Sequence, residues 1–136
     1  MTCPFCTNIQ QAIFYESKLS YGIYNLKPLV PGHILVIPKA HKVHLLNLTK
    51  EEHIDFFNTV REVSKRLKKV YKADGLSLLI QDGKIAGQTV PHLHMHIAPL
   101  DAKISTWEYV QNAPKSKDRS AISATEIKKE VKRLKE

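Results

Sequence analysis

The sequence predicts an α+β fold in which a mostly antiparallel sheet of five strands packs with one long helix and a C-terminal helix. Short runs of apolar and β-branched residues between Pro, Gly and Asp residues indicate the strands. A long helical repeat of apolar residues begins after Thr49, and a second helix-start signal lies at Ser123. Because 136 residues make about one average domain, we expect residues 1–136 to fold as a single domain.

The strands are expected in the segments between the turn and helix signals. Their predicted ranges are 12–16, 21–26, 33–37, 76–81 and 92–98. The first two flank a turn at 18–20, and the third ends at Pro38. The fifth alternates strictly between polar and apolar residues, which is the clearest strand pattern in the chain.

The long helix is predicted from its start signal, its repeat and its stop signal. Thr49 followed three residues later by Glu52 is a capping box, which satisfies two backbone N–H groups at a helix start. Apolar residues then recur at helical spacing at Ile54, Phe57, Val60, Val63, Leu67 and Val70. We expect this helix to end near Ala73, before Asp74 and Gly75.

The C-terminal part, residues 101–136, has a weaker pattern. It is expected to hold a short helical turn at 105–112 and a polar, mobile loop at 114–120. Ser123 followed by Glu126 is a second capping box, and it predicts a basic helix that runs to the C-terminus.

Composition excludes several classes of protein. With 43% hydrophobic and 25% charged residues the chain can bury a core, so it is not disordered, collagenous or of low complexity. The longest apolar runs, such as 34–37, are far shorter than the about 20 residues of a membrane-spanning helix. The start of the chain also lacks a secretory signal, so we expect a cytoplasmic protein.

The net charge of +8 favours an anionic partner. Many of the basic residues, however, lie in two runs at 65–69 and 128–135, which are typical of solvated helix faces. The charge alone does not choose between nucleotides, nucleic acids and acidic lipids, and a nucleic acid is not expected, because so short a chain has no appended nucleic-acid domain.

The most informative feature is three histidines at every second position, His92, His94 and His96. On a strand, residues i, i+2 and i+4 point to the same face, so the imidazoles are expected side by side. Two chemistries fit this arrangement. Neutral imidazoles bind metal ions, and a single imidazole acts as a nucleophile that forms a covalent intermediate.

The two cysteines form a Cys-Pro-Phe-Cys motif at Cys3 and Cys6. This spacing fits a redox pair or half of a metal site. A thioredoxin-type redox pair follows a strand, and no strand fits before Cys3, so half of a zinc site is favoured over a redox site. A plain pair of reduced thiols fits the spacing equally well.

Residues 92–98 resemble the His-φ-His-φ-His-φ-φ signature of the histidine triad (HIT) superfamily of nucleotide hydrolases and transferases. Residues 25–39 are similar to a second block of that family. Residues 81–83 and 87–90 most resemble the fragile-histidine-triad (Fhit) branch, which hydrolyses diadenosine polyphosphates. Together these segments cover about residues 1–100, and they imply a five-stranded HIT sheet.

The resemblance implies catalytic roles for three residues. His94, the middle histidine, would attack the α-phosphate of a dinucleoside polyphosphate to form a nucleotidyl-histidine that water then releases. His96 would hydrogen-bond the oxygens of the same phosphate, and Gln88 would lie near the leaving phosphate. An imidazole nucleophile also needs an acceptor on its other nitrogen, which selects the reactive tautomer.

The resemblance further implies a substrate-binding group of Asn25, Gln81, Thr89 and His33. Asn25 would bind ribose hydroxyls, and Gln81 and Thr89 would line the path of the phosphates. His33 would pack behind the triad and orient the nucleophile His94.

Some HIT proteins with an N-terminal Cys-x-x-Cys complete a zinc site with two histidines. In this sequence the implied ligands are Cys3, Cys6, His41 and His92, a closed set of the structural kind. His44 is a rival to His41, because it lies close by in the chain. Without zinc, His92 would act in the phosphate site instead.

The implied partners are an adenine nucleotide, Mg²⁺ as a phosphate-neutralising ion and a second copy of the chain. HIT homodimers commonly form through the long helix and the adjoining strand. The apolar stripe of the long helix is compatible with such a dimer, but packing of the helix on its own sheet explains the stripe equally well. The alternatives are a nucleoside phosphoramidase and a non-enzymatic nucleotide sensor, while removal of AMP from DNA ends lacks support. One departure from the Fhit pattern is Leu100, where that branch usually has an arginine.

Overall fold

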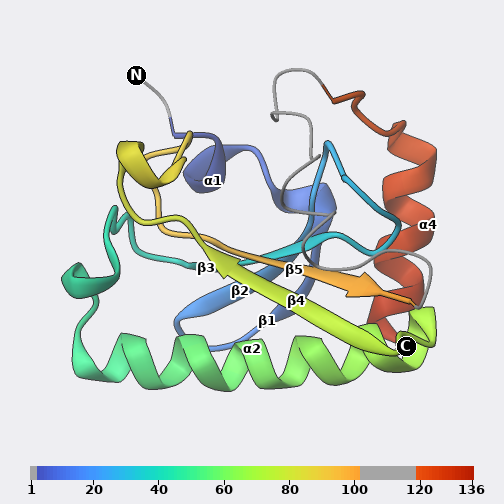
Figure 1. Ribbon diagram of the computed structural model, residues 1–136, viewed down its shortest axis with the longest axis horizontal. Coiled ribbons are helices and arrows are strands. Elements are labelled where there is room, and N and C mark those ends of the chain that lie inside the picture. Colours follow the sequence, from blue (N-terminus) through green and yellow to red (C-terminus); the bar gives the residue numbers. More distant parts are fainter. Residues whose placement is uncertain (1–2, 102–118) are drawn as a thin grey trace.

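A computed structural model describes residues 3–101 and 119–136. Its strands form one antiparallel sheet of five strands in the order β1-β2-β3-β5-β4, which confirms the predicted fold class (Figure 1). The strands are β1 (Ile13–Glu16), β2 (Ser20–Tyr24), β3 (Ile34–Pro38), β4 (Gly75–Ile80) and β5 (Met95–Leu100). The predicted helical turn at 105–112 and most of the predicted loop at 114–120 lie outside the described residues.

Helix α2 (Lys50–Tyr71) runs along one side of the sheet and packs against β2 and β3 (Figure 1). Its predicted capping box is present, since Thr49 Oγ1 accepts from the Glu52 N–H and Glu52 Oε1 accepts from the Thr49 N–H. The helix ends two residues earlier than predicted, because Lys72 adopts a left-handed conformation with φ of 51°. The break therefore comes before Asp74 and Gly75.

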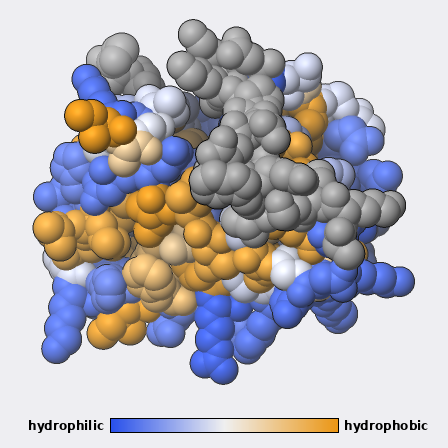
Figure 2. All heavy atoms as spheres, viewed as in Figure 1, coloured by the Kyte–Doolittle hydropathy of each residue, from blue (hydrophilic) through white to orange (hydrophobic). Residues whose placement is uncertain are grey.

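The apolar residues predicted to form one stripe along α2 lie on two different faces of the helix. Val63 and Leu67 are fully buried against the sheet. Ile54 and Phe57, predicted on the same stripe, are 53% and 39% exposed, because the inner face of this turn is made by Phe56 and Thr59. Figure 2 shows hydrophobic residues gathered across the face formed by β4 and α2.

Helix α4 (Ala124–Lys135) packs on β1 and on α2, as expected of a C-terminal helix. Ser123 caps it, because its Oγ accepts from the Glu126 N–H. Ile127 and Leu134 of α4 join the core. No helix in the part of the chain that the structure describes is long and apolar enough to cross a membrane.

Strand β5 begins at Met95, three residues later than predicted. The cause is that the preceding main chain bonds elsewhere: the His92 N–H donates to the Val90 carbonyl, and the Leu93 N–H donates to the Lys42 carbonyl. Sheet pairing starts only at Met95. Only His96 of the three histidines therefore lies in the strand, and the expectation that all three share one strand face was wrong.

In residues 3–101 and 119–136, four short helical elements escaped prediction because each is too short to show a period. They are α1 (Pro4–Thr7), η1 (Gln10–Ala12), η2 (Leu45–Asn47) and η3 (Lys84–Ala86). Helix α1 lies on the side of the sheet away from α2 (Figure 1). It thus covers the segment that carries the histidines.

Candidate active site

A pocket of about 350 Å³ lies between the α1–η1 segment and the sheet. Its size is that of a small-molecule site. It is lined by Pro4, Phe5, Asn8, Ile9, Ala12, Ile23, Tyr24, Asn25, Leu26, Lys27, Leu35, Thr89, Val90, His94, His96 and Arg119. Four predicted site residues therefore meet in it, namely His94, His96, Asn25 and Thr89.

His94 is held in one tautomer by the main chain. Its Nδ1 atom lies 2.8 Å from the carbonyl oxygen of His92, and because a carbonyl only accepts, Nδ1 must carry the proton. The other ring nitrogen, Nε2, is then unprotonated. Burial lowers the pKa of His94 below its ordinary value, although the bond to the carbonyl opposes the shift. His94 thus has the lone pair that a nucleophile needs.

His96 is held in the opposite tautomer by a relay through His33. The Leu29 N–H donates to His33 Nδ1 at 3.0 Å, so the proton of neutral His33 lies on Nε2. That Nε2–H donates to His96 Nδ1, also at 3.0 Å. His96 therefore carries its own proton on Nε2, as a hydrogen-bond donor. Burial lowers the pKa of both His33 and His96 to about 3, which keeps the relay neutral.

The relay corrects the role expected for His33. This residue is 1% exposed and does not line the pocket, so it is not a substrate-binding residue. Its ring bonds His96 rather than His94, and the acceptor that orients His94 is the carbonyl of His92. The sequence pattern could not show this, because a main-chain acceptor has no residue-type signal.

Asn25 and Thr89 stand at the pocket wall as predicted. Asn25 Oδ1 accepts from the Lys27 N–H at 2.9 Å, which fixes the side chain. Its Nδ2 lies 3.3 Å from His33 Nε2, but both atoms are donors in the tautomer above. The amide protons of Asn25 are therefore available to an acceptor in the pocket. Thr89 is exposed at the rim.

The structure places Gln88 differently from its predicted catalytic position. Gln88 is 8% exposed, its Oε1 accepts from the Gly83 N–H, and its Nε2 donates to the carbonyls of Val43 and Val90. All of its hydrogen-bonding atoms thus brace the loop before the histidines, outside the pocket lining. It is a support for the loop rather than a contact with the pocket.

Gln81 also lies outside the pocket lining. It packs against Gly87, whose φ is 102°. A Cβ at that glycine would come within 2.5 Å of Gln81 Nε2. The glycine is therefore required both by its backbone conformation and by this contact.

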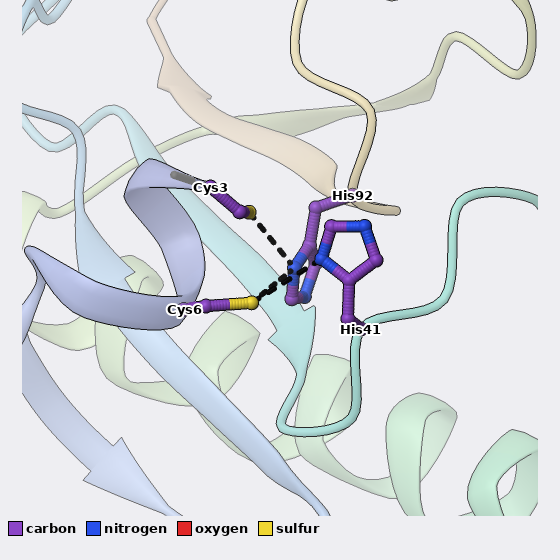
Figure 3. Close-up of side chains that lie close together, drawn as sticks. All are labelled: Cys3, Cys6, His41 and His92. Carbon is purple, nitrogen blue, oxygen red and sulfur yellow. Dashed lines mark hydrogen bonds between the residues drawn. The ribbon is translucent and has the colours of Figure 1, made fainter. Parts of the chain in front are cut away.

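A second cluster brings together Cys3, Cys6, His41 and His92, whose ligand atoms all lie within 4.8 Å of one another (Figure 3). His92 Nδ1 is 3.4 Å from Cys3 Sγ and 3.5 Å from Cys6 Sγ, and His41 Nδ1 is 3.2 Å from Cys6 Sγ. Around a tetrahedral zinc ion with ordinary bond lengths, sulfur and nitrogen ligands lie about 3.5 Å apart. The four side chains therefore fit such an ion.

The surroundings of the cluster support the same assignment. His92 Nε2 donates to the Pro38 carbonyl at 2.8 Å, which leaves Nδ1 unprotonated toward the sulfurs. The rival His44 points elsewhere, because its Nδ1 lies 2.7 Å from Asp82 Oδ1. Of the two histidines, the structure thus brings His41 to the cysteines.

Phe5 is a site residue that the sequence patterns did not indicate. It lies between the two cysteines, lines the pocket, and its ring centre is 5.1 Å from that of His94 and 5.8 Å from that of His92. A phenylalanine inside a Cys-x-x-Cys motif carries no signal of its own. Arg119, also in the lining, was not singled out for the same reason.

Comparisons with known proteins agree with this geometry. The family model described as "HIT domain" matches residues 6–103. The bis(5'-adenosyl)-triphosphatase of Saccharomyces cerevisiae is 46% identical over 92 residues, which cover 67% of this chain and 45% of the relative. The asymmetrical bis(5'-nucleosyl)-tetraphosphatase of Schizosaccharomyces pombe is 49% identical over 87 residues, 64% of this chain and 48% of the relative. The chain thus spans about half the length of these curated relatives.

Among solved structures, a zinc-bound histidine triad family protein from Mycobacterium smegmatis superposes with a TM-score of 0.76. It is 27% identical in sequence, and the match covers 99% of this chain and 91% of that protein. The similarity extends over the N-terminal segment with the cysteines as well as the sheet.

Proposed function

The chain belongs to the HIT domain family, and on this premise we propose that it hydrolyses dinucleoside polyphosphates such as diadenosine tri- or tetraphosphate. The observation that carries the proposal is the pair of opposite tautomers at His94 and His96, whose ring centres are 5.0 Å apart in one pocket. One ring offers a lone pair and the other a proton, which is what attack on a phosphate requires. The two hydrolases named above act on this class of substrate.

His94 would act as the nucleophile. Its Nε2 lone pair attacks the α-phosphorus, a P–N bond forms, and the P–O bond to the bridging oxygen breaks. The rest of the substrate leaves as an anion, ADP from diadenosine triphosphate. The Nδ1–H group keeps its hydrogen bond to the carbonyl of His92, and this bond stabilises the positively charged ring of the intermediate. Water then attacks the phosphorus, breaks the P–N bond and releases AMP and a proton.

His96 and Asn25 would hold the substrate during this step. The Nε2–H of His96 donates to a non-bridging oxygen, and this donor is already oriented by the His33 relay before substrate arrives. The amide of Asn25 donates to ribose oxygens. The polyphosphate would enter as its Mg²⁺ complex, since a divalent cation reduces its charge.

The apolar part of the pocket fits a purine base. Ile9, Ile23, Leu26 and Leu35 line it together with Phe5, and side chains of this kind sandwich a flat ring. We therefore propose an adenine nucleotide as the occupant.

We further propose that Zn²⁺ is the metal held by Cys3, Cys6, His41 and His92. With four protein ligands it would have no open position, so its chemistry is structural. The distances of the cluster and the zinc-bound relative from Mycobacterium smegmatis support this assignment. The metal would bind α1, and with it Phe5, to the histidine segment.

A homodimer through β4 and α2 is the oligomer that the surface favours. Strand β4 is at the end of the sheet, and Leu78 on it is 46% exposed, as are Ile54 and Phe57 of α2 at 53% and 39%. Figure 2 shows a hydrophobic band over the same two elements. Joining two β4 edges would continue the sheet and cover this band. Light scattering after size exclusion should give twice the chain mass for the wild type, and a Leu78→Glu variant should give a monomer.

The test of the function compares wild-type protein with His94→Asn on diadenosine tri- and tetraphosphate, with adenosine phosphoramidate alongside. The wild type should release AMP from both dinucleotides, with ADP from the triphosphate and ATP from the tetraphosphate, and oxygen-18 from labelled water should enter only the AMP. His94→Asn should bind AMP but lose turnover. Preference for the phosphoramidate would favour the phosphoramidase alternative, and AMP binding without any turnover would favour the sensor.

A further inference from the structure

Arg119 enters the pocket from a part of the chain far from the histidine motif. It precedes α4, and the Ile122 N–H donates to the carbonyl of Leu26 at 3.0 Å. Ile127 and Leu134 anchor α4 in the core. These contacts hold the segment before α4 beside the turn that carries Asn25, so the side chain of Arg119, which is partly buried, reaches the pocket lining.

The pocket needs positive charge for an anionic substrate. None of the described residues that line it is acidic, and its cationic side chains among them are Lys27 and Arg119. His33 and His96 remain neutral near pH 7, because burial lowers the pKa of each to about 3. The charge of a polyphosphate must therefore be met by an arginine, a lysine or an accompanying cation.

Arg119 lines the same pocket as the two histidines His94 and His96. Burial is the main cause of the lowered pKa of His96 and of His33, and the positive charge of Arg119 also disfavours protonation of both rings. His96 is the residue whose Nε2–H faces the phosphate in the proposed reaction.

We propose that Arg119 is a phosphate-binding residue, whose guanidinium clamps the non-bridging oxygens of the polyphosphate beside His96. The proposal rests on the proposed function for the identity of the ligand. A guanidinium offers two parallel N–H donors to a phosphate and stays charged at every relevant pH. Arg119 would thereby make the pocket select phosphate-bearing ligands over bare nucleosides.

The experiment measures binding of ADP, AMP and adenosine by calorimetry or NMR titration. Arg119→Gln should weaken ADP roughly 10- to 100-fold, as expected for loss of a charge-assisted contact, and leave adenosine within about twofold. The ADP affinity of Arg119→Lys should fall between those of the wild type and Arg119→Gln, because a lysine keeps the charge but not the two parallel N–H donors of the guanidinium. Arg61→Gln is the matched control. Arg61 is exposed on α2, so this change removes the same charge and should leave the affinities for ADP and adenosine unchanged.

Two outcomes would overturn the proposal. Equal losses for ADP and adenosine in Arg119→Gln would mean that the side chain only shapes the pocket. Unchanged ADP affinity would mean that it does not contact phosphate. Turnover of diadenosine triphosphate by the wild type is measured separately. If it is absent, the hydrolase function fails, while the difference between ADP and adenosine still decides the role of Arg119.

Discussion

The imidazole of His94 is bonded to the main-chain carbonyl of His92, with 2.8 Å between Nδ1 and O, while the side chain of His92 faces Cys3 and Cys6. His92 thus takes part in both the metal cluster and the pocket: its ring is a proposed metal ligand, and its carbonyl orients the proposed nucleophile His94. Phe5, between the cysteines, packs edge-on against the His94 ring and adds a second link. The metal cluster is therefore expected to control the geometry of the pocket.

Loss of the proposed metal should loosen both the metal cluster and the pocket. His41 and His44, which lie close together in the chain, allow a matched test. His41→Gln should lose bound zinc in elemental analysis, lower Tm by roughly 5 °C or more, and weaken AMP binding, because α1 and Phe5 lose their anchor. His44→Gln should keep zinc and AMP affinity, because His44 pairs with Asp82 outside the cluster. Loss of zinc in His44→Gln and not in His41→Gln would contradict the assignment.

The His33 relay predicts a kinetic effect of a residue outside the pocket. His33→Gln should lower kcat on diadenosine triphosphate roughly 10- to 100-fold with little change in KM, since a glutamine amide presents an acceptor as well as a donor to His96 and so no longer selects its tautomer. Nitrogen-15 NMR should show the proton of His96 moving away from Nε2. His53→Gln, a change at an exposed position on α2, should have neither effect.

A purely structural role of His33 would give a different result. In that case Tm would fall, but the ring-nitrogen shifts of His96 in the folded variant would stay as in the wild type. Near-UV circular dichroism should be recorded first to establish that His33→Gln is folded.

The relay also predicts how stability depends on pH. The pKa of His33 and of His96 is about 3 in the folded protein, against an ordinary value near 6.5. Between these values the unfolded chain binds protons that the folded protein does not, so the free energy of unfolding must rise with pH in this range. The stabilisation is complete above about pH 6.5 and is lost as pH falls toward 3.

Urea unfolding at pH 7.5, 6.0 and 5.0 measures this effect. Loss of the proposed metal at low pH would also destabilise the wild type, so the comparison is with His33→Gln, which keeps the four cluster residues. The variant should show a shallower fall in free energy of unfolding from pH 7.5 to 5.0. Parallel curves for the two proteins would mean that His33 does not take part in the linkage.

The sequence predicted the sheet, both long helices and their caps because these depend on local signals. The Thr49–Glu52 capping box and the apolar run of β3 are examples, since each depends on neighbouring residues only. The position of β5 was missed because the main chain at Leu93 bonds Lys42, a contact across 51 residues. The exposure of Ile54 and Phe57 was missed because a helical repeat does not tell which apolar residues a second surface covers.

The site shows the same division between local and distant signals. His94, His96 and Asn25 line the pocket as predicted, and the two cysteines lie beside His41 and His92. Gln88 lies outside the pocket lining because it bonds main-chain groups of Gly83, Val43 and Val90, and no residue type in the sequence indicates such partners. Phe5 and Arg119 were not singled out because their place in the pocket comes from chain packing alone.

Three glycines give a graded test of backbone strain and side-chain packing. Gly32 has φ of 88°, and a Cβ there would lie 2.6 Å from Pro99 Cγ and 2.9 Å from the Tyr71 ring, so Gly32→Ala should cost both backbone strain and displacement of two side chains. Gly83 has φ of 98° but no atom within 4 Å of such a Cβ, so Gly83→Ala should cost about 1 kcal/mol from strain alone. Gly75 has neither feature, and Gly75→Ala should leave Tm unchanged or slightly raised. Thermal unfolding should rank the stabilities Gly75→Ala, Gly83→Ala, Gly32→Ala from highest to lowest, and a Gly32→Ala variant as stable as Gly83→Ala would show that Pro99 and Tyr71 yield to the new methyl group without cost.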